Sequence, residues 1–186
     1  MRILGLDLRR KNVRGVEIES SFGRFEIQDY HERQVYLGET PERAAAMLVA
    51  SLKKRPDKII TTLPSGKITF RNLLIPTRDK KAIENGVQFE LEDELPFEGE
   101  SIVFSYAPLS QDKKGSFLHV MVTLKKYLSD TLEKLNKENI DPDFITSEAW
   151  AYRNLLNKTI APAEQKKPIM LLQMGSDRTM IYVHHQ

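Results

Sequence analysis

One pattern, a buried strand followed by a polar turn and a second strand, occurs near both ends of this 186-residue chain. At the start, the apolar run 3–8 leads through a charged turn to residues 13–19, which alternate apolar and charged side chains. Near the end, the apolar run 169–174 leads through a Gly-Ser-Asp turn to the strand 179–183. Short apolar runs are typical of buried strands, and alternation is typical of half-exposed ones. The repetition predicts that two related sheets each begin with this strand pair.

The first half of the chain predicts further strands and a helix between these ends. Residues 25–30 alternate again, so we expect an antiparallel meander of three strands. Thr40 and Pro41 predict a helix start, because threonine caps a helix and proline suits its first turn. Two more strands are predicted at 58–63 and 68–75. We expect these five strands to form one sheet, covered by the helix.

A second module is predicted from Asp79 onward. The sequence indicates a helix that ends before Pro96, two strands at 102–107 and 117–123, and a second helix beginning at Leu124. A short strand at 144–145 and a helix through Trp150, Leu155 and Leu156 follow. The helices carry apolar stripes at helical spacing: Ile83, Val87, Leu91 and Leu95 in the first, and Leu124, Leu128, Leu132 and Leu135 in the second. The order α-β-β-α-β-α predicts a compact inserted layer of sheet and helices.

The composition excludes several classes of protein. Cysteine is absent, which rules out disulfides, thiolate zinc sites and a cysteine nucleophile. No window approaches the roughly 18–20 apolar residues that a transmembrane helix needs. The net charge is only +2, and the lysines occur in scattered pairs, which argues against nucleic acid as a partner. We expect a cytoplasmic domain.

Few side chains are candidates for chemistry. The densest acidic block lies in residues 90–100, and we interpret it as a polar helix face and a loop. His184 and His185 are adjacent, but no third metal ligand is evident, and the sequence reveals no partner for His31 or His119. We therefore predict no catalytic residue and no metal site.

A family resemblance covers nearly the whole chain. The motifs that carry it are, in chain order, Leu4–Leu8 with Asn12–Glu17, Leu63–Pro64, Phe89–Phe97, Val103–Tyr106, Leu132–Leu135 before Ile140–Pro142, and Ser147–Ala151. Their order and spacing resemble the PilM and GspL proteins. These are FtsA-related, actin-like components of the assembly platforms of type IV pili and type II secretion systems.

The resemblance implies an α/β fold. It is an actin-like (ribonuclease H-type) sheet-and-helix domain with an inserted α+β subdomain of the FtsA 1C type. Residues 1–78 are then expected to form subdomain 1A, 79–158 the 1C-like subdomain, 159–168 a linker, and 169–186 the start of the second actin-like domain. Because the sequence stops just after a new strand pair, we expect it to be a fragment of a longer chain.

The resemblance also implies vestigial phosphate-binding turns. The residues it places there are Asp7, Arg9, Lys11 and Asn12 in the first turn, and Gly175 and Thr179 in the second. Glycine in such a turn lets a phosphate approach the backbone, and the aspartate of the first strand helps to hold magnesium. An aspartate that caps its own turn and a basic turn in contact with solvent are the alternative interpretations of the first turn.

Two departures from the family pattern bear on activity. Arg9 stands where the first turn has glycine, and Gln173 stands where the second has aspartate. These changes predict no ATP hydrolysis and no cofactor, with ATP and magnesium as the alternative. They also favour GspL over PilM.

The resemblance finally implies a binding role. A GspL-like domain is expected to be a non-enzymatic scaffold of the type II secretion inner-membrane platform that recruits the secretion ATPase. It would lie in the cytoplasm, peripheral to or anchored at the inner membrane. The expected partners are a secretion or pilus assembly ATPase, platform proteins of the GspM or PilN type, and a second copy in a homodimer. The alternatives are a PilM-like pilus protein that binds a PilN-type tail, with or without ATP, and a true ATPase or sugar-kinase relative.

Overall fold

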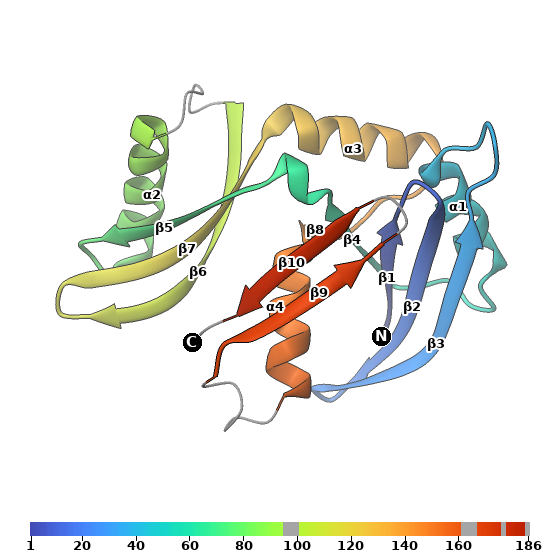
Figure 1. Cartoon of the computed structure of the whole chain (residues 1–186), viewed down its shortest axis with the longest axis horizontal. Coiled ribbons are helices and arrows are strands. Elements are labelled where there is room, and N and C mark those ends of the chain that lie inside the picture. The colour runs from blue at the N-terminus through green and yellow to red at the C-terminus, as the bar shows by residue number, and fades with distance from the viewer. Residues whose placement is uncertain (95–100, 161–166, 176–177, 185–186) are drawn as a thin grey trace. The chain divides into compact units, whose positions relative to one another are not determined.

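The computed structural model describes residues 1–94, 101–160, 167–175 and 178–184. The chain divides into two compact units: Met1–Leu63 with Leu132–Gln186, and Pro64–Thr131. Figure 1 labels the elements of both units. Mixed strands and helices make this an α/β chain.

The first unit contains a five-stranded sheet of order β3-β2-β1-β4-β8. Strands β1 (Arg2–Leu8), β2 (Asn12–Ser21) and β3 (Arg24–Gln34) form an antiparallel meander, which confirms the prediction from alternation. Strand β4 (Lys58–Leu63) runs parallel to β1, and β8 (Phe144–Ser147) runs parallel to β4. The sheet is therefore mixed, with β1 at its centre.

Helix α1 (Pro41–Ser51) packs on β1, β2 and β3. The Thr40 hydroxyl accepts a hydrogen bond from the backbone N–H of Arg43, as predicted for the helix start. The core of this unit joins the sheet to α1 and to residues 135–140, and consists of Leu4, Leu6, Val13, Ala44, Ala45, Leu48, Leu135 and Ile140. Burial of these side chains fixes the central strand, at whose end the candidate site lies.

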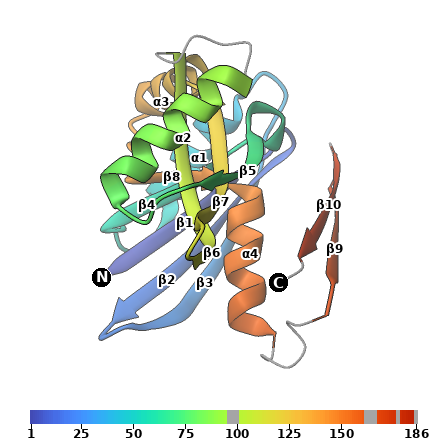
Figure 2. The same ribbon diagram turned by 90° about the vertical axis from the view of Figure 1, so that its left-hand side faces the viewer.

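Three more elements complete this part of the chain. Helix α4 (Glu148–Thr159) begins at once after β8, and the Ser147 hydroxyl caps it by accepting from the backbone N–H of Trp150. Strands β9 (Ile169–Met174) and β10 (Thr179–His184) form a separate antiparallel hairpin. Helix α4 contacts both β8 and β10, so the hairpin lies beside this helix (Figure 2).

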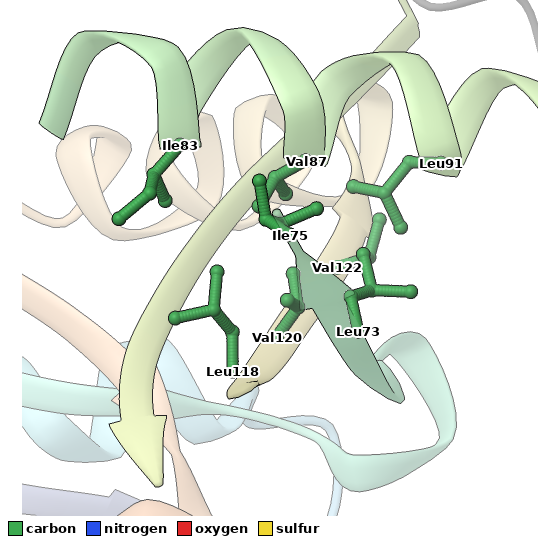
Figure 3. Packing of buried hydrophobic residues seen from close by; sticks show 8 residues of the cluster. All are labelled: Leu73, Ile75, Ile83, Val87, Leu91, Leu118, Val120 and Val122. Atoms are coloured by element: carbon green, nitrogen blue, oxygen red, sulfur yellow. The ribbon is translucent and has the colours of Figure 1, made fainter. Parts of the chain in front are cut away.

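The second unit is a three-stranded antiparallel sheet with one helix on it. Its strands are β5 (Thr69–Ile75), β6 (Ile102–Asp112) and β7 (Gly115–Leu124), in the order β5-β7-β6. A short 3-10 turn, η1 (Ser65–Lys67), precedes β5. Helix α2 (Lys80–Glu94) lies over the sheet, and Figure 3 shows its apolar side chains packed on those of β5 and β7. The core consists of Leu73, Ile75, Ile83, Val87, Leu91, Leu118, Val120 and Val122.

Two expectations about strand pairing were wrong. The strand at 68–75 was expected in the first sheet, but β5 pairs with β7 in the second. The strand at 144–145 was expected in the inserted layer, but β8 pairs with β4 in the first sheet. Periodicity identifies a strand without naming its partner, because every strand presents the same main-chain donors and acceptors.

The predicted domain limits and the compact units have different bounds. The inserted segment was placed at 79–158, whereas the second compact unit spans Pro64–Thr131, because β5 belongs to its sheet and β8 does not. Helix α3 (Lys125–Lys137) extends past the end of that unit. The linker centre at 161–166, the helix stop at Pro96, the end of the acidic block and His185 lie outside the described residues. No helix in the described ranges is long and apolar enough to cross a bilayer.

Candidate functional site

The first turn predicted to hold phosphate is closed by a backbone hydrogen bond between its own residues. The backbone N–H of Arg9 donates to the carbonyl of Asn12 at 2.9 Å, which joins the end of β1 to the start of β2. The side chain of Arg9 is only 7% exposed, although it belongs to a charged turn. A buried guanidinium needs partners for its charge and its donors.

Asp7 and Glu148 supply these partners. The Nε of Arg9 lies 2.8 Å from Asp7 Oδ1 and 3.0 Å from Oδ2, so it contacts both oxygens of this carboxylate. The Nη2 of the same arginine lies 2.6 Å from Glu148 Oε1. Arg9 therefore joins the end of β1 to the first residue of α4.

The second predicted turn reaches the same carboxylate. Its backbone closes through a 2.9 Å hydrogen bond from the Gly175 N–H to the Arg178 carbonyl. The Arg178 side chain then places Nη2 at 2.6 Å from Glu148 Oε1. One oxygen of Glu148 thus contacts an arginine from each turn, and we call Asp7, Arg9, Glu148 and Arg178 the arginine–carboxylate network.

The position of Glu148 follows from local structure. Ser147 ends β8 and caps α4, so the next residue opens the helix, where a negative charge is favourable. Glu148 is 4% exposed, and its two arginine partners balance the two carboxylates of the network. The network is formally neutral, which makes burial of its charges tolerable.

The environment changes two pKa values in this region. Burial alone would lower the pKa of Arg9, but hydrogen bonding and attraction to Asp7, with Glu148 adding to them, raise it above its ordinary value. Burial raises the pKa of Tyr152, against the opposing effect of the positive charge of Arg9. Both groups therefore keep their protons at neutral pH.

The other predicted residues divide between the network and the solvent. Lys11 is exposed, and the side-chain amide of Asn12 donates to Glu32 on β3. Gly175 shapes the second turn, whereas Thr179 is exposed at the start of β10. The structure thus brings Asp7, Arg9 and the Gly175 turn together.

Two members of the network were missed in the sequence. Glu148 was considered only as part of the family motif Ser147–Ala151, and Arg178 was not considered. The residues around Glu148 do not indicate which side chain its carboxylate will contact. Its partner Arg9 lies 139 positions earlier in the sequence (148 minus 9). Each of the two similar turns contains an arginine, Arg9 in the first and Arg178 in the second. This repetition was the available signal.

The carboxylate that the resemblance assigns to magnesium is engaged by a side chain of this chain. Both oxygens of Asp7 already accept from Arg9, and the side chain of Arg9 lies where a glycine would leave the backbone open. Among the described residues of the network there is no hydroxyl nucleophile paired with a base. What the arrangement can do is hold the two turns on the first residue of α4 through ion pairs.

Two histidines for which the sequence revealed no partner, His31 and His119, each contact a side chain in the structure. The His31 Nε2 lies 2.7 Å from Glu17 Oε1. The His119 Nδ1 lies 2.7 Å from Asn72 Oδ1, and its ring stacks on Phe70 with centroids 5.1 Å apart. These partners lie on adjacent strands, and only the strand register reveals them.

Solved structures show the same fold. The chain is similar to a structure described as a PilM-PilN type IV pilus biogenesis complex, with a TM-score of 0.80, 20% identity and coverage of 98% of this chain and 58% of that one. It is also similar to the cytoplasmic domain of EpsL, an inner-membrane component of the Vibrio cholerae type II secretion system. Here the TM-score is 0.62, the identity 15%, and the coverage 100% of this chain and 71% of that one.

A third structure names the fold. It is a Bacteroides thetaiotaomicron protein with an actin-like ATPase fold and unknown function, with a TM-score of 0.50, 10% identity, and coverage of 99% of this chain and 65% of that one. The predicted actin-like fold is confirmed. This chain spans 58% of the length of the PilM-PilN complex chain that it matches.

Sequence comparison gives the family. No curated protein sequence matches this chain. A family model described as type II secretion system (T2SS), protein L, matches residues 25–152, which is more than half of the chain. The chain belongs to the family of type II secretion system protein L.

Proposed function

We propose that this chain is part of a non-enzymatic scaffold in the inner-membrane platform of a type II secretion system, and that it recruits the secretion ATPase. Membership of the protein L family supports the choice of system. The arginine–carboxylate network supports the absence of turnover, because Arg9 contacts both oxygens of the aspartate that magnesium would need. This is the observation that carries the proposal.

The proposal includes a location and partners. The solved cytoplasmic domain of EpsL belongs to an inner-membrane component, which supports a position at the cytoplasmic face of that membrane. We expect GspM-type platform proteins and a second copy of the chain as further partners. ATP is not expected as a cofactor.

The test is binding of the complete cytoplasmic region to the secretion ATPase of the same system. The two purified proteins are mixed without nucleotide and their association is measured by sedimentation velocity. A saturable complex is expected, with no phosphate released by the scaffold alone in Mg-ATP. Failure to form any complex with the ATPase or with a GspM-type protein contradicts the scaffold. Magnesium-dependent phosphate release above that of an Asp7→Ala variant contradicts its non-enzymatic character.

A PilM-like role is the second candidate. The similarity to the PilM-PilN complex, with its TM-score of 0.80, is the observation that favours it. A synthetic PilN-type amino-terminal peptide distinguishes the two: in the PilM-like case it binds the complete cytoplasmic region, whereas the GspL-like case predicts binding of the ATPase and not of the peptide.

A further inference from the structure

Three potential metal ligands meet on the β2–β3 ladder, away from the arginine–carboxylate network. Glu17 of β2 lies directly opposite Asp29 of β3, and His31 is two positions further along, opposite Gly15. Because side chains alternate along a strand, Asp29 and His31 share one face of the sheet. A Cβ built on Gly15 would lie 3.1 Å from Leu48 of α1 and 3.7 Å from the Cβ of His31, so this is the face that α1 covers.

The distances between the ligand atoms suit a small divalent cation. His31 Nε2 lies 2.7 Å from Glu17 Oε1 and 4.0 Å from Asp29 Oδ2, and all three ligand atoms lie within 4.8 Å of one another. Bonds of about 2.0–2.1 Å in a tetrahedron place neighbouring ligand atoms roughly 3.3 Å apart. The His31–Glu17 distance is shorter than that value and the His31–Asp29 distance is longer, so side-chain rotations that part the first pair and bring Asp29 closer form the site on an unchanged ladder.

The charges of this cluster also point to a cation. Two carboxylates directly opposite each other on paired strands repel, and a cation bound between them removes this repulsion. A bulge between Glu17 and Ile18 interrupts the ladder beside this pair. Glu17 and His31 are 20% and 24% exposed, so solvent screens their charges less than those of fully exposed side chains.

Space for further ligands lies beside the cluster. A cavity of about 180 Å³ is lined by Glu17 and Asp29 among others, and it has room for the water that completes a tetrahedron. Lys53 and Lys54 line the same cavity and oppose a cation there. Both lysines are exposed, so their ammonium groups can extend into solvent, and they weaken the site without blocking it.

We propose that Glu17, Asp29 and His31 form a binding site for a divalent transition metal of the zinc class. The imidazole selects zinc, cobalt or nickel over calcium and magnesium, which prefer oxygen ligands alone. The proposal is independent of the scaffold function. A metal here would clamp β2 to the edge strand β3, and therefore would stabilise that edge of the sheet.

The test is a zinc titration of the chain after treatment with a chelator. The starting protein carries His184→Gln and His185→Gln, so that the adjacent terminal histidines contribute no binding. Calorimetry is expected to show one zinc ion per chain, and saturating zinc is expected to raise the thermal midpoint. Cobalt in place of zinc is expected to give the strong visible absorption of a tetrahedral site.

Variants decide whether these three residues are the ligands. His31→Gln and Asp29→Asn are each expected to lower the zinc affinity by roughly 100-fold, by analogy with the 10–100-fold effects of weaker outer-shell changes. Asp29 is 58% exposed, so its variant tests the site even where His31→Gln perturbs folding. His119→Gln is the matched control and should leave the affinity unchanged. Absence of zinc binding at micromolar concentrations, or binding that survives both ligand variants, overturns the proposal.

Discussion

The guanidinium of Arg9 and the carboxylate of Glu148 form a buried ion pair, with Nη2 2.6 Å from Oε1 and both side chains less than 10% exposed. Each member has a second partner, Asp7 for the arginine and Arg178 for the glutamate. Multiple partners are needed because an isolated charge in this position would cost several kcal/mol of desolvation. The pair and Arg178 together therefore connect three segments that are far apart in the sequence.

Glu148→Gln should lower the free energy of unfolding by about 3 kcal/mol, since removal of one partner leaves buried charge uncompensated. The amide keeps the size of the side chain, so the loss measures charge rather than packing. Chemical denaturation followed by circular dichroism gives the number, with the slope of the transition checked for constancy.

The matched control is Glu133→Gln on α3. Glu133 also makes an ion pair, with its Oε1 2.7 Å from Lys137 Nζ, but the two side chains are 66% and 70% exposed. Exposed pairs of this spacing contribute little to stability, because water and salt screen their attraction. Equal losses in the two variants would contradict the view that the network stabilises this part of the fold.

Mg-ATP at millimolar concentration should leave the thermal midpoint of the complete cytoplasmic region unchanged. A ligand that binds the native state must raise its stability, and here the carboxylate of Asp7 is already occupied by Arg9. Arg9→Gly is the informative variant, because it frees Asp7 and restores the glycine of the family pattern. A saturable upward shift in the unmodified protein would show that nucleotide displaces Arg9, and would favour the PilM-like role.

Local patterns predicted the elements well. Three of the predicted features depend only on residues close together in the sequence. They are the Thr40 cap, the alternation of residues 13–19 and the helix stripe Ile83, Val87, Leu91. Ile83, Val87 and Leu91 are buried in the core of the second unit, as predicted, and Leu95, the fourth residue of the stripe, lies outside the described residues. Such features follow from the period of side chains along a helix or strand, which the sequence displays directly.

Partners across long sequence distances were not predictable in the same way. The strand β5 was identified, but its pairing with β7 depends on contacts that no periodicity records. Likewise, Glu17 and His31 meet only because β2 and β3 pair in one register, with a bulge between Glu17 and Ile18. A register shift of one residue would send these side chains to opposite faces. The candidate site shares this property, since Arg9 was identified and its partner Glu148 was not.

Gly115→Ala should destabilise the second unit by at least about 3 kcal/mol. Gly115 has a φ of +142°, and an added Cβ would lie 2.2 Å from the carbonyl oxygen of Ile75. Backbone on the neighbouring strand cannot withdraw from this clash without breaking the β5–β7 ladder. Gly66→Ala is the control, because open space surrounds its Cβ, and it should change stability by less than about 0.5 kcal/mol. Similar results for the two variants, measured by denaturation, would refute the argument.

Asp143 should make the stability of the first unit depend on pH in the acid range. Hydrogen bonds from Lys58 and from the backbone N–H of Ile59 lower its pKa below the ordinary 3.8. Its contribution is therefore fully present above about pH 4 and is lost as the pH falls through the lower folded-state value. The thermal midpoint of the wild type should exceed that of Asp143→Asn near neutral pH, and this difference should shrink as the pH falls from about 4 towards 2. A difference that stays constant over this range would mean that the charge of Asp143 does not contribute.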